Sequence, residues 1–160
     1  MTRRFGIDVG GVITDRVNDR ADTSFFSDNF LSTTAVGGAF DAIATIVRTL
    51  GRENVFVISK CGPAVQAKTG KWLEHHRFFD VTGMDPQNLH FCRTREEKTP
   101  ICARLGITDF VDDRIDVLRF MDGVVARRFL FAPKPWSHPP GGLTAVANWA
   151  EVLAKAGIAA

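Results

Sequence analysis

The chain has 160 residues, of which 45% are hydrophobic and 24% are charged, and its formal net charge is +2. This length fits one domain with its own core, and so small a net charge gives no electrostatic reason to expect binding to nucleic acid or to a membrane surface. No apolar stretch approaches the roughly 20 residues of a membrane span. The three cysteines lack metal-ligand spacing, and we interpret them as reduced thiols of a cytoplasmic protein; they are Cys61, Cys92 and Cys102.

The first half of the chain predicts strands and helices in alternation. An apolar run at 5–9 stops at two glycines, which indicates a buried strand followed by a tight turn. Residues 14–34 are mostly polar, and we interpret them as a long loop or flap that is held down by Phe25, Phe26 and Phe30. Then come a helix over 35–50 that Gly51 ends, a buried strand over 55–58, and a helix over 63–77 with Pro63 in its first turn.

The second half continues this alternation. A strand over 89–92 precedes a helix over 98–105, for which Thr94 and Glu97 form a capping-box pattern. After it we expect a strand over 109–111, a short helix over 115–121, a strand over 124–131 and a closing helix over 143–156. Strands that alternate with helices predict an α/β fold, here a three-layer α/β/α sandwich around a parallel, Rossmann-like sheet with right-handed crossovers.

Asp8 ends an apolar strand and precedes Gly10 and Gly11. Glycines allow the backbone to turn sharply and to approach a ligand closely, because they carry no Cβ. Asp8 is therefore a candidate nucleophile or metal ligand in the crevice at the carboxyl ends of the strands. The alternative is a carboxylate that only caps the turn after the strand.

A second acidic site follows the strand at 109–111. Asp112 and Asp113 are adjacent, and their carboxylates repel each other unless a cation lies nearby. Magnesium commonly binds one or two carboxylates together with water and phosphate oxygens, so the pair is a candidate metal site. The alternative is an ordinary N-cap of the helix that follows.

Three further polar residues fall near predicted strand or helix ends. Ser59 and Lys60 follow the apolar strand at 55–58, and the Ser59 hydroxyl either holds a phosphate oxygen or caps the helix at Pro63. Lys98 lies in a charged run, where it is either a functional cation or part of a solvated helix face. A rigid, proline-rich loop at 132–140 emerges on the same sheet edge and is either a connector or part of a pocket wall with Lys134, Trp136 or His138.

Taken in chain order, Asp8, Ser59, Lys98 and the Asp112-Asp113 pair resemble the active-site motifs of the haloacid dehalogenase superfamily of phosphohydrolases. The resemblance extends over nearly the whole chain. Receiver domains also combine acidic residues, a hydroxyl and a lysine on a parallel sheet, but their acidic pair comes early and their lysine last. The order in this sequence matches the dehalogenase-like pattern.

The resemblance implies a role for each residue. Asp8 would attack phosphorus and form an aspartyl-phosphate. Ser59 and Lys98 would bind and steady the transferring phosphoryl group, with Gly11 and Lys60 also contributing to the substrate site. A magnesium ion would be held by Asp8, the backbone carbonyl of Gly10, Asp112 and Asp113. Cations are needed because a carboxylate is a weak nucleophile toward a dianionic phosphate.

One position departs from the family pattern. Phosphatases of this family usually carry a second aspartate two residues after the nucleophile, which protonates the leaving group, and here that position is Gly10. General acid–base help contributes roughly 10²–10⁴ in rate. Three interpretations remain: another group or water replaces the acid, the substrate has a good leaving group, or the domain binds phosphate ligands without turnover.

The chain also has no room for the cap domain that many relatives insert. Residues 14–34 offer only a flap, so the site is expected to be open, which favours a bulky phosphorylated molecule or closure by that flap or by a second subunit of a homo-oligomer. The expected function is a magnesium-dependent phosphatase that acts on a phosphomonoester. The alternatives are a catalytically weak or inactive phosphate-binding or interaction domain and, less favoured because of Asp112 and Asp113, dehalogenation.

Overall fold

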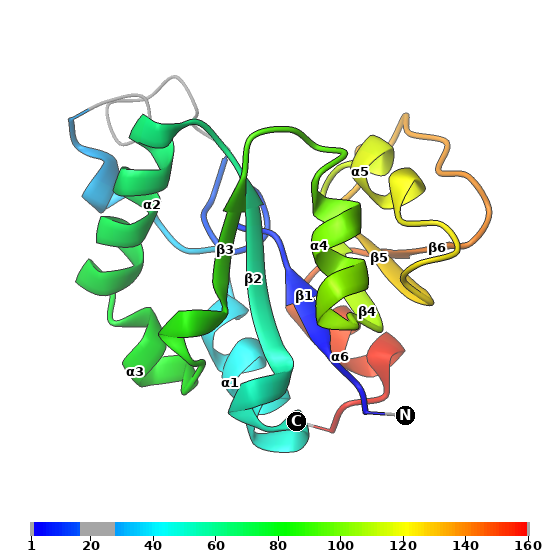
Figure 1. Cartoon of the computed structure of the whole chain (residues 1–160), viewed down its shortest axis with the longest axis horizontal. Coiled ribbons are helices and arrows are strands. Elements are labelled where there is room, and N and C mark those ends of the chain that lie inside the picture. The colour runs from blue at the N-terminus through cyan, green and yellow to red at the C-terminus, as the bar shows by residue number, and fades with distance from the viewer. Residues whose placement is uncertain (1, 17–27, 160) are drawn as a thin grey trace.

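A sheet of parallel strands forms the centre of the molecule in the computed structural model, which describes residues 2–16 and 28–159 (Figure 1). The spatial order of its six strands is β3-β2-β1-β4-β5-β6, and every neighbouring pair is parallel. The strands are β1 (Phe5–Ile7), β2 (Val55–Lys60), β3 (Leu89–Cys92), β4 (Asp109–Asp112), β5 (Arg127–Phe131) and β6 (Leu143–Val146).

Helices cover both faces of this sheet. They are α1 (Ala39–Leu50), α2 (Pro63–His75), α3 (Phe78–Thr82), α4 (Lys98–Leu105), α5 (Ile115–Phe120) and α6 (Trp149–Ala156). Because side chains alternate across a strand, Val55 and Val57 of β2 join a core with α1, α2, α3 and α6. Phe56 and Ile58 join a second core with α4 and α5. These two cores confirm the predicted three-layer α/β/α fold.

The predicted closing helix over 143–156 is wrong in its first part. Residues Leu143–Val146 form strand β6, which pairs with β5, and the helix begins only at Trp149. Asn148 is the residue that starts it, because its side chain accepts a hydrogen bond from the Glu151 amide over 2.9 Å. Pairing with β5 therefore outweighs the helix-like spacing of the apolar residues at this end of the chain.

Smaller differences affect element boundaries. α1 begins at Ala39 rather than at residue 35, β5 begins at Arg127 rather than at 124, and the short helix α3 was not predicted. The capping-box pattern before α4 is half confirmed: the Glu97 carboxylate accepts from the Thr94 amide over 2.9 Å, but regular helix starts only at Lys98.

The predicted flap at 14–34 is described only at its two ends, and Phe25 and Phe26 lie outside the described residues. These ends lie together, because Thr14 bridges to Ala35 and the Asp15 amide donates to the Thr34 carbonyl over 2.9 Å. Phe30 packs against the core on the α1 face of the sheet, as predicted for the phenylalanines of this segment.

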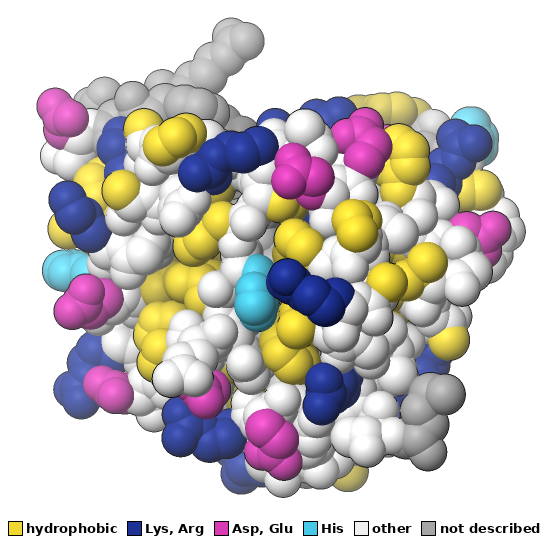
Figure 2. Space-filling view, in the orientation of Figure 1, with side chains coloured by type: hydrophobic (Ala, Val, Ile, Leu, Met, Phe, Trp, Pro, Cys, Tyr) yellow, Lys and Arg dark blue, Asp and Glu magenta, His cyan; other side chains and the backbone are white. Residues whose placement is uncertain are grey.

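The surface is electrostatically mixed. In Figure 2, lysine and arginine side chains are interspersed with aspartate and glutamate over the visible face, as the small net charge implies. Among the described residues, no helix has the length and apolar character needed to cross a membrane.

Candidate active site

Three carboxylates meet at the carboxyl ends of β1 and β4, which are neighbours in the sheet. Asp8 follows β1 directly, Asp112 is the last residue of β4, and Asp113 comes next. One oxygen from each carboxylate lies within 4.8 Å of the others. The structure thus brings together the two acidic sites that the sequence places more than a hundred residues apart.

Lys98 joins this cluster from the first turn of α4. Its ammonium lies 2.9 Å from Oδ1 of Asp8 and 2.8 Å from Oδ2 of Asp112, and the residue is only 2% exposed. The other Asp112 oxygen accepts a hydrogen bond from the Arg114 amide over 3.0 Å. These contacts exclude the alternative of a solvated helix face for Lys98.

Three carboxylates face one ammonium in the cluster, and the pKa shifts of these groups reflect both their burial and their charges. Burial raises the pKa of Asp112, and the Asp8 carboxylate raises it further, although Lys98 partly opposes both effects. Burial and Asp8 also raise the pKa of Asp113. Burial alone would lower the pKa of Lys98, but Asp8 and Asp112 outweigh it and raise that pKa. A cluster of this kind favours an additional cation.

The residues present fit a hard divalent cation. Oδ1 of Asp113 is buried and has no hydrogen-bond partner within the part of the chain that the structure describes, and a buried carboxylate oxygen without a partner is costly. Together with Asp8 and Asp112 it offers the all-oxygen donor set that suits Mg²⁺. The alternative of a simple N-cap is not supported, because α5 begins without a side-chain cap.

The turn after β1 is held by hydrogen bonds on both sides. The Val9 carbonyl accepts from the amides of Val12, Ile13 and Thr14 at 2.7–3.1 Å. The Val12 carbonyl accepts from the buried indole N–H of Trp149 in α6 over 2.8 Å. This turn therefore follows Asp8 as a rigid unit, and the last helix of the chain supports it.

Gly11 is required by the geometry of this turn. Its φ is +79°, a region that favours glycine, and a Cβ at this position would contact the Asp113 carboxylate. Its amide donates to the Thr14 carbonyl over 2.8 Å. Gly11 also lines the larger of the two cavities described below. The predicted role of Gly11 in substrate binding stays a prediction, as does metal binding by the Gly10 carbonyl.

Arg16 occupies the space beside Gly10. The φ of Gly10 lies outside the left-handed region, but a Cβ there would lie 2.6 Å from Nε and 2.7 Å from Cζ of the Arg16 guanidinium. Arg16 also lies 3.6 Å from Oδ2 of Asp113. Sequence reasoning missed Arg16, because it belongs to the polar stretch at 14–34, where no periodicity distinguishes one charged residue from another.

β2 is the neighbour of β1 on the side opposite to β4, and Ser59 and Lys60 are its last two residues. Ser59 is 6% exposed, and burial raises the pKa of the nearby Cys61 thiol. Ser59 does not cap α2, because the N-cap residue of that helix is Gly62 and no side chain hydrogen-bonds there. The capping alternative for Ser59 is thus excluded, while its role toward a phosphoryl group stays a prediction.

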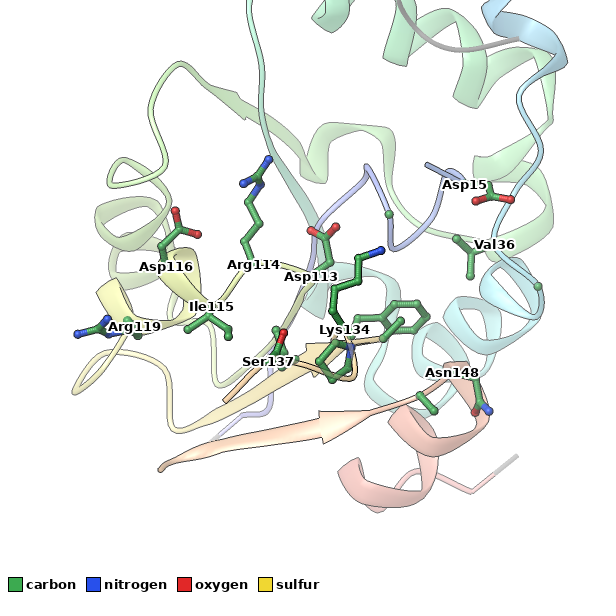
Figure 3. A pocket seen from close by; sticks show the side chains of 17 residues that line it. Asp15, Val36, Asp113, Arg114, Ile115, Asp116, Arg119, Lys134, Ser137 and Asn148 are labelled. Carbon is green, nitrogen blue, oxygen red and sulfur yellow. The ribbon is translucent and has the colours of Figure 1, made fainter. Parts of the chain in front are cut away.

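Two cavities adjoin the carboxylate cluster. A small one of about 60 Å³ is lined by five cationic side chains together with Asp8 and Val117; the cations are Arg16, Lys60, Arg95, Lys98 and Arg114. A larger cavity of about 870 Å³ is lined, on the side of the carboxylate cluster, by Gly11, Asp113 and Arg114 (Figure 3). Lys134 and Ser137 from the loop after β5 line it, whereas Trp136 is 73% exposed and does not.

The sequence significantly matches no protein-family model and no curated protein. Solved structures do match the fold. D,D-heptose 1,7-bisphosphate phosphatase from Burkholderia thailandensis superposes with a TM-score of 0.62 at 14% identity, over 96% of this chain and 97% of that one. The chain has the haloacid dehalogenase-like fold. A haloacid dehalogenase-like family hydrolase from Xanthomonas campestris also has a TM-score of 0.62, at 10% identity over 97% and 94% of the two chains.

A third structure with the haloacid dehalogenase-like fold is larger than this protein. This haloacid dehalogenase-like hydrolase from Burkholderia xenovorans LB400 has a TM-score of 0.55 at 14% identity, and the match covers 81% of this chain but 61% of that one. The fold expected from the order of Asp8, Ser59, Lys98 and Asp112 is therefore confirmed by likeness in three dimensions, although overall sequence identity is only 10–14%.

Proposed function

We propose that the protein is a magnesium-dependent phosphohydrolase that works through an aspartyl-phosphate on Asp8 and removes a terminal phosphoryl group, in the simplest case from a phosphomonoester. The observation that carries this proposal is the position of Lys98. Its buried ammonium joins Asp8 to Asp112, while Asp113 beside them keeps one oxygen without a partner among the described residues. The names of the similar structures, a phosphatase and two hydrolases, support it.

Each of these residues has a separate role in the proposed reaction. An oxygen of Asp8 attacks phosphorus, and Lys98 holds that carboxylate in place and reduces its repulsion toward the phosphoryl oxygens. Asp8, Asp112 and Asp113 would hold Mg²⁺, which supplies further charge neutralisation and alignment when bound. Water then releases phosphate from Asp8 and regenerates the carboxylate. We propose that the site takes either a small or a bulkier phosphorylated molecule, with closure by the 14–34 segment or by a second subunit.

A second candidate function is favoured by one observation. Gly10 offers no acid, and the space beside it holds the guanidinium of Arg16. Such a site would bind a phosphate group well but hydrolyse phosphorylated substrates slowly, so the protein would be a catalytically weak or inactive phosphate-binding domain. The two functions share their ligand chemistry and differ in whether a phosphorus–oxygen bond is broken.

The deciding experiment measures phosphate release from a panel of phosphomonoesters and an aryl phosphate, with Mg²⁺ and with chelator. The wild-type protein is compared with Asp8→Asn, which keeps the shape of the side chain and removes its charge. We expect release that needs Mg²⁺ and is lost in the variant. Undiminished release in Asp8→Asn would remove Asp8 from the mechanism. Absence of release, with phosphate binding measurable by calorimetry, would favour the binding domain.

A further inference from the structure

We propose that the preferred substrates are phosphoanhydrides, in which the terminal phosphoryl group is linked through oxygen to a second phosphate, and that Arg16 binds the departing phosphate. This inference rests on the proposed phosphohydrolase function and narrows its substrate class. It follows from the surroundings of Asp8, where a permanent cation occupies the space beside Gly10 and further cations line the same cavity.

Among the described residues, the cavity beside Asp8 offers few groups that could protonate a leaving oxygen. Among the described residues, Asp8 is the sole carboxylate on its wall, and no histidine lines it. The ammonium of Lys98 is engaged by Asp8 and Asp112. Arginine remains protonated in proteins and does not act as an acid. Lys60 is then the one remaining possible proton donor that the described residues place on this wall. An alkoxide leaving group, which needs a proton, would depend on this lysine, whereas a phosphate leaves as a stable anion.

The same wall is suited to an anion that departs without a proton. Arg16 and Arg95 are each paired with one aspartate, at 3.6 Å to Asp113 and 2.9 Å to Asp116. Lys60 and Arg114 line the cavity and form no ion pair within the described part of the chain. Because Lys98 is already matched by two carboxylates, the remaining cations supply positive charge beyond what the attacking carboxylate requires. Arginine is well matched to phosphate oxygens, since its guanidinium presents a planar fork of donors.

The size of the two cavities indicates where the second phosphate lies. The small cavity of about 60 Å³ equals the volume of about two water molecules in liquid, so it holds little more than the transferring phosphoryl group. Arg114 lines both this cavity and the larger one of about 870 Å³. A second phosphate would therefore lie at the boundary between Arg16 and Arg114, with the remainder of the molecule directed to the larger pocket.

The reaction balances without an enzyme acid. An oxygen of Asp8 forms a bond to the terminal phosphorus, and the bond from that phosphorus to the bridging oxygen breaks. The electron pair stays on the bridging oxygen, which leaves as part of a phosphate anion held by Arg16. Water then attacks the phosphorus of the aspartyl-phosphate and loses its proton to solvent, and Asp8 regains its carboxylate as the transferred phosphoryl group departs as phosphate. One anhydride linkage and one water give two phosphate groups.

The test compares two substrates whose leaving groups have similar basicity, pyrophosphate and p-nitrophenyl phosphate, on the full chain with saturating Mg²⁺. Only pyrophosphate has a phosphate as its leaving group, which is the group that Arg16 would bind. Arg16→Gln should lower kcat/KM for pyrophosphate roughly 10- to 100-fold more than it lowers kcat/KM for p-nitrophenyl phosphate, the effect of one lost charge-assisted hydrogen bond. Arg16→Lys should recover part of the loss. Arg104→Gln, on the exposed end of α4, is the matched control.

The outcomes separate this inference from the function on which it rests. Faster wild-type hydrolysis of pyrophosphate than of p-nitrophenyl phosphate and of glycerol phosphate, with the selective loss in Arg16→Gln, supports it. Asp8-dependent hydrolysis of p-nitrophenyl phosphate without preference for pyrophosphate, or an equal loss for both substrates in Arg16→Gln, overturns the substrate class and leaves the function standing. Hydrolysis of neither substrate overturns both. Folding of each variant is checked by its thermal transition.

Discussion

The ammonium of Lys98 and the carboxylate of Asp112 lie 2.8 Å apart, and the two side chains are 3% and 0% exposed. A buried pair of this kind contributes little net stability compared with apolar residues, but removal of one partner leaves an uncompensated charge in a low-dielectric surrounding. Here the consequence is larger than for a single pair, because the same lysine also faces Asp8.

Lys98→Met should therefore lower the free energy of unfolding by about 3–5 kcal/mol in the absence of metal. Urea denaturation followed by circular dichroism measures this loss. The matched control is Lys155→Met, an exposed lysine in the last turn of α6, which should change stability by no more than about 0.5 kcal/mol. A loss below about 1 kcal/mol for Lys98→Met would show that the carboxylates are neutralised in another way.

Magnesium affinity should rise with pH. Burial and the neighbouring Asp8 raise the pKa of both Asp112 and Asp113, that of Asp112 to about 8. A carboxyl group with a raised pKa in the folded state keeps a proton that the unfolded chain has lost, so metal-free stability falls as pH rises from the ordinary carboxyl range toward the raised value. Mg²⁺ must displace this proton, and its binding is therefore favoured at the upper end of that window.

Calorimetric titration with Mg²⁺ at about pH 6 and about pH 8, each in two buffers of different ionisation enthalpy, counts the protons released. We expect weaker binding and more proton release at the lower pH. Chelator should lower the thermal transition more at the higher pH, where the metal-free carboxylates repel one another. An affinity that does not change with pH would mean that these carboxyl groups are already ionised in the folded protein.

Gly11→Ala should lower the free energy of unfolding by more than the left-handed backbone conformation of Gly11 alone explains. Gly11 and Gly123 have nearly the same φ, +79° and +78°, but a Cβ at Gly11 would contact Asp113 whereas one at Gly123 meets nothing within 4 Å. Gly123→Ala should cost about 1–2 kcal/mol from the left-handed conformation alone. Gly11→Ala should cost more and should also weaken Mg²⁺ binding, because the added methyl group displaces the Asp113 carboxylate. Equal effects of the two substitutions would show that Asp113 adapts freely.

Addition of the missing acid tests the place of Arg16. In Gly10→Asp the new carboxylate would contact the Arg16 guanidinium, which favours its ionised form and weakens it as an acid. The single variant should thus gain little activity toward glycerol phosphate. In the double variant Gly10→Asp with Arg16→Gln, activity toward glycerol phosphate should increase more, by up to the roughly 10²–10⁴-fold that general acid–base catalysis contributes. A full gain in the single variant would contradict the proposed contact.

The convergence of Asp8, Lys98 and Asp112 could be predicted from the sequence, because each lies at a strand end or a helix start and parallel strands end at one edge of the sheet. The depth of Lys98 could not be predicted in this way. Its charged sequence neighbours resemble those of a surface helix, and only the packing of α4 against the sheet places it in the core.

Arg16 and β6 show what sequence patterns leave undetermined. The guanidinium of Arg16 reaches Gly10 because the ends of the 14–34 segment are drawn together at Thr14 and Ala35, a contact between distant residues with no local signature. β6 exists because β5 is beside it, and its apolar residues at 143 and 146 also suit one face of a helix. The capping pair Asn148 and Glu151 was the available signal for the true start of α6.

The indole of Trp149 supports the turn behind Asp8 from 137 residues further along the chain. A nascent polypeptide that has been synthesised only as far as β5 already contains Asp8, Lys98 and Asp113, yet it lacks the helix whose N–H holds the Val12 carbonyl. The turn should therefore remain loosely held until α6 has docked, so that assembly of the Asp8 site, and the proposed activity with it, depends on the folding of a segment far from it in sequence.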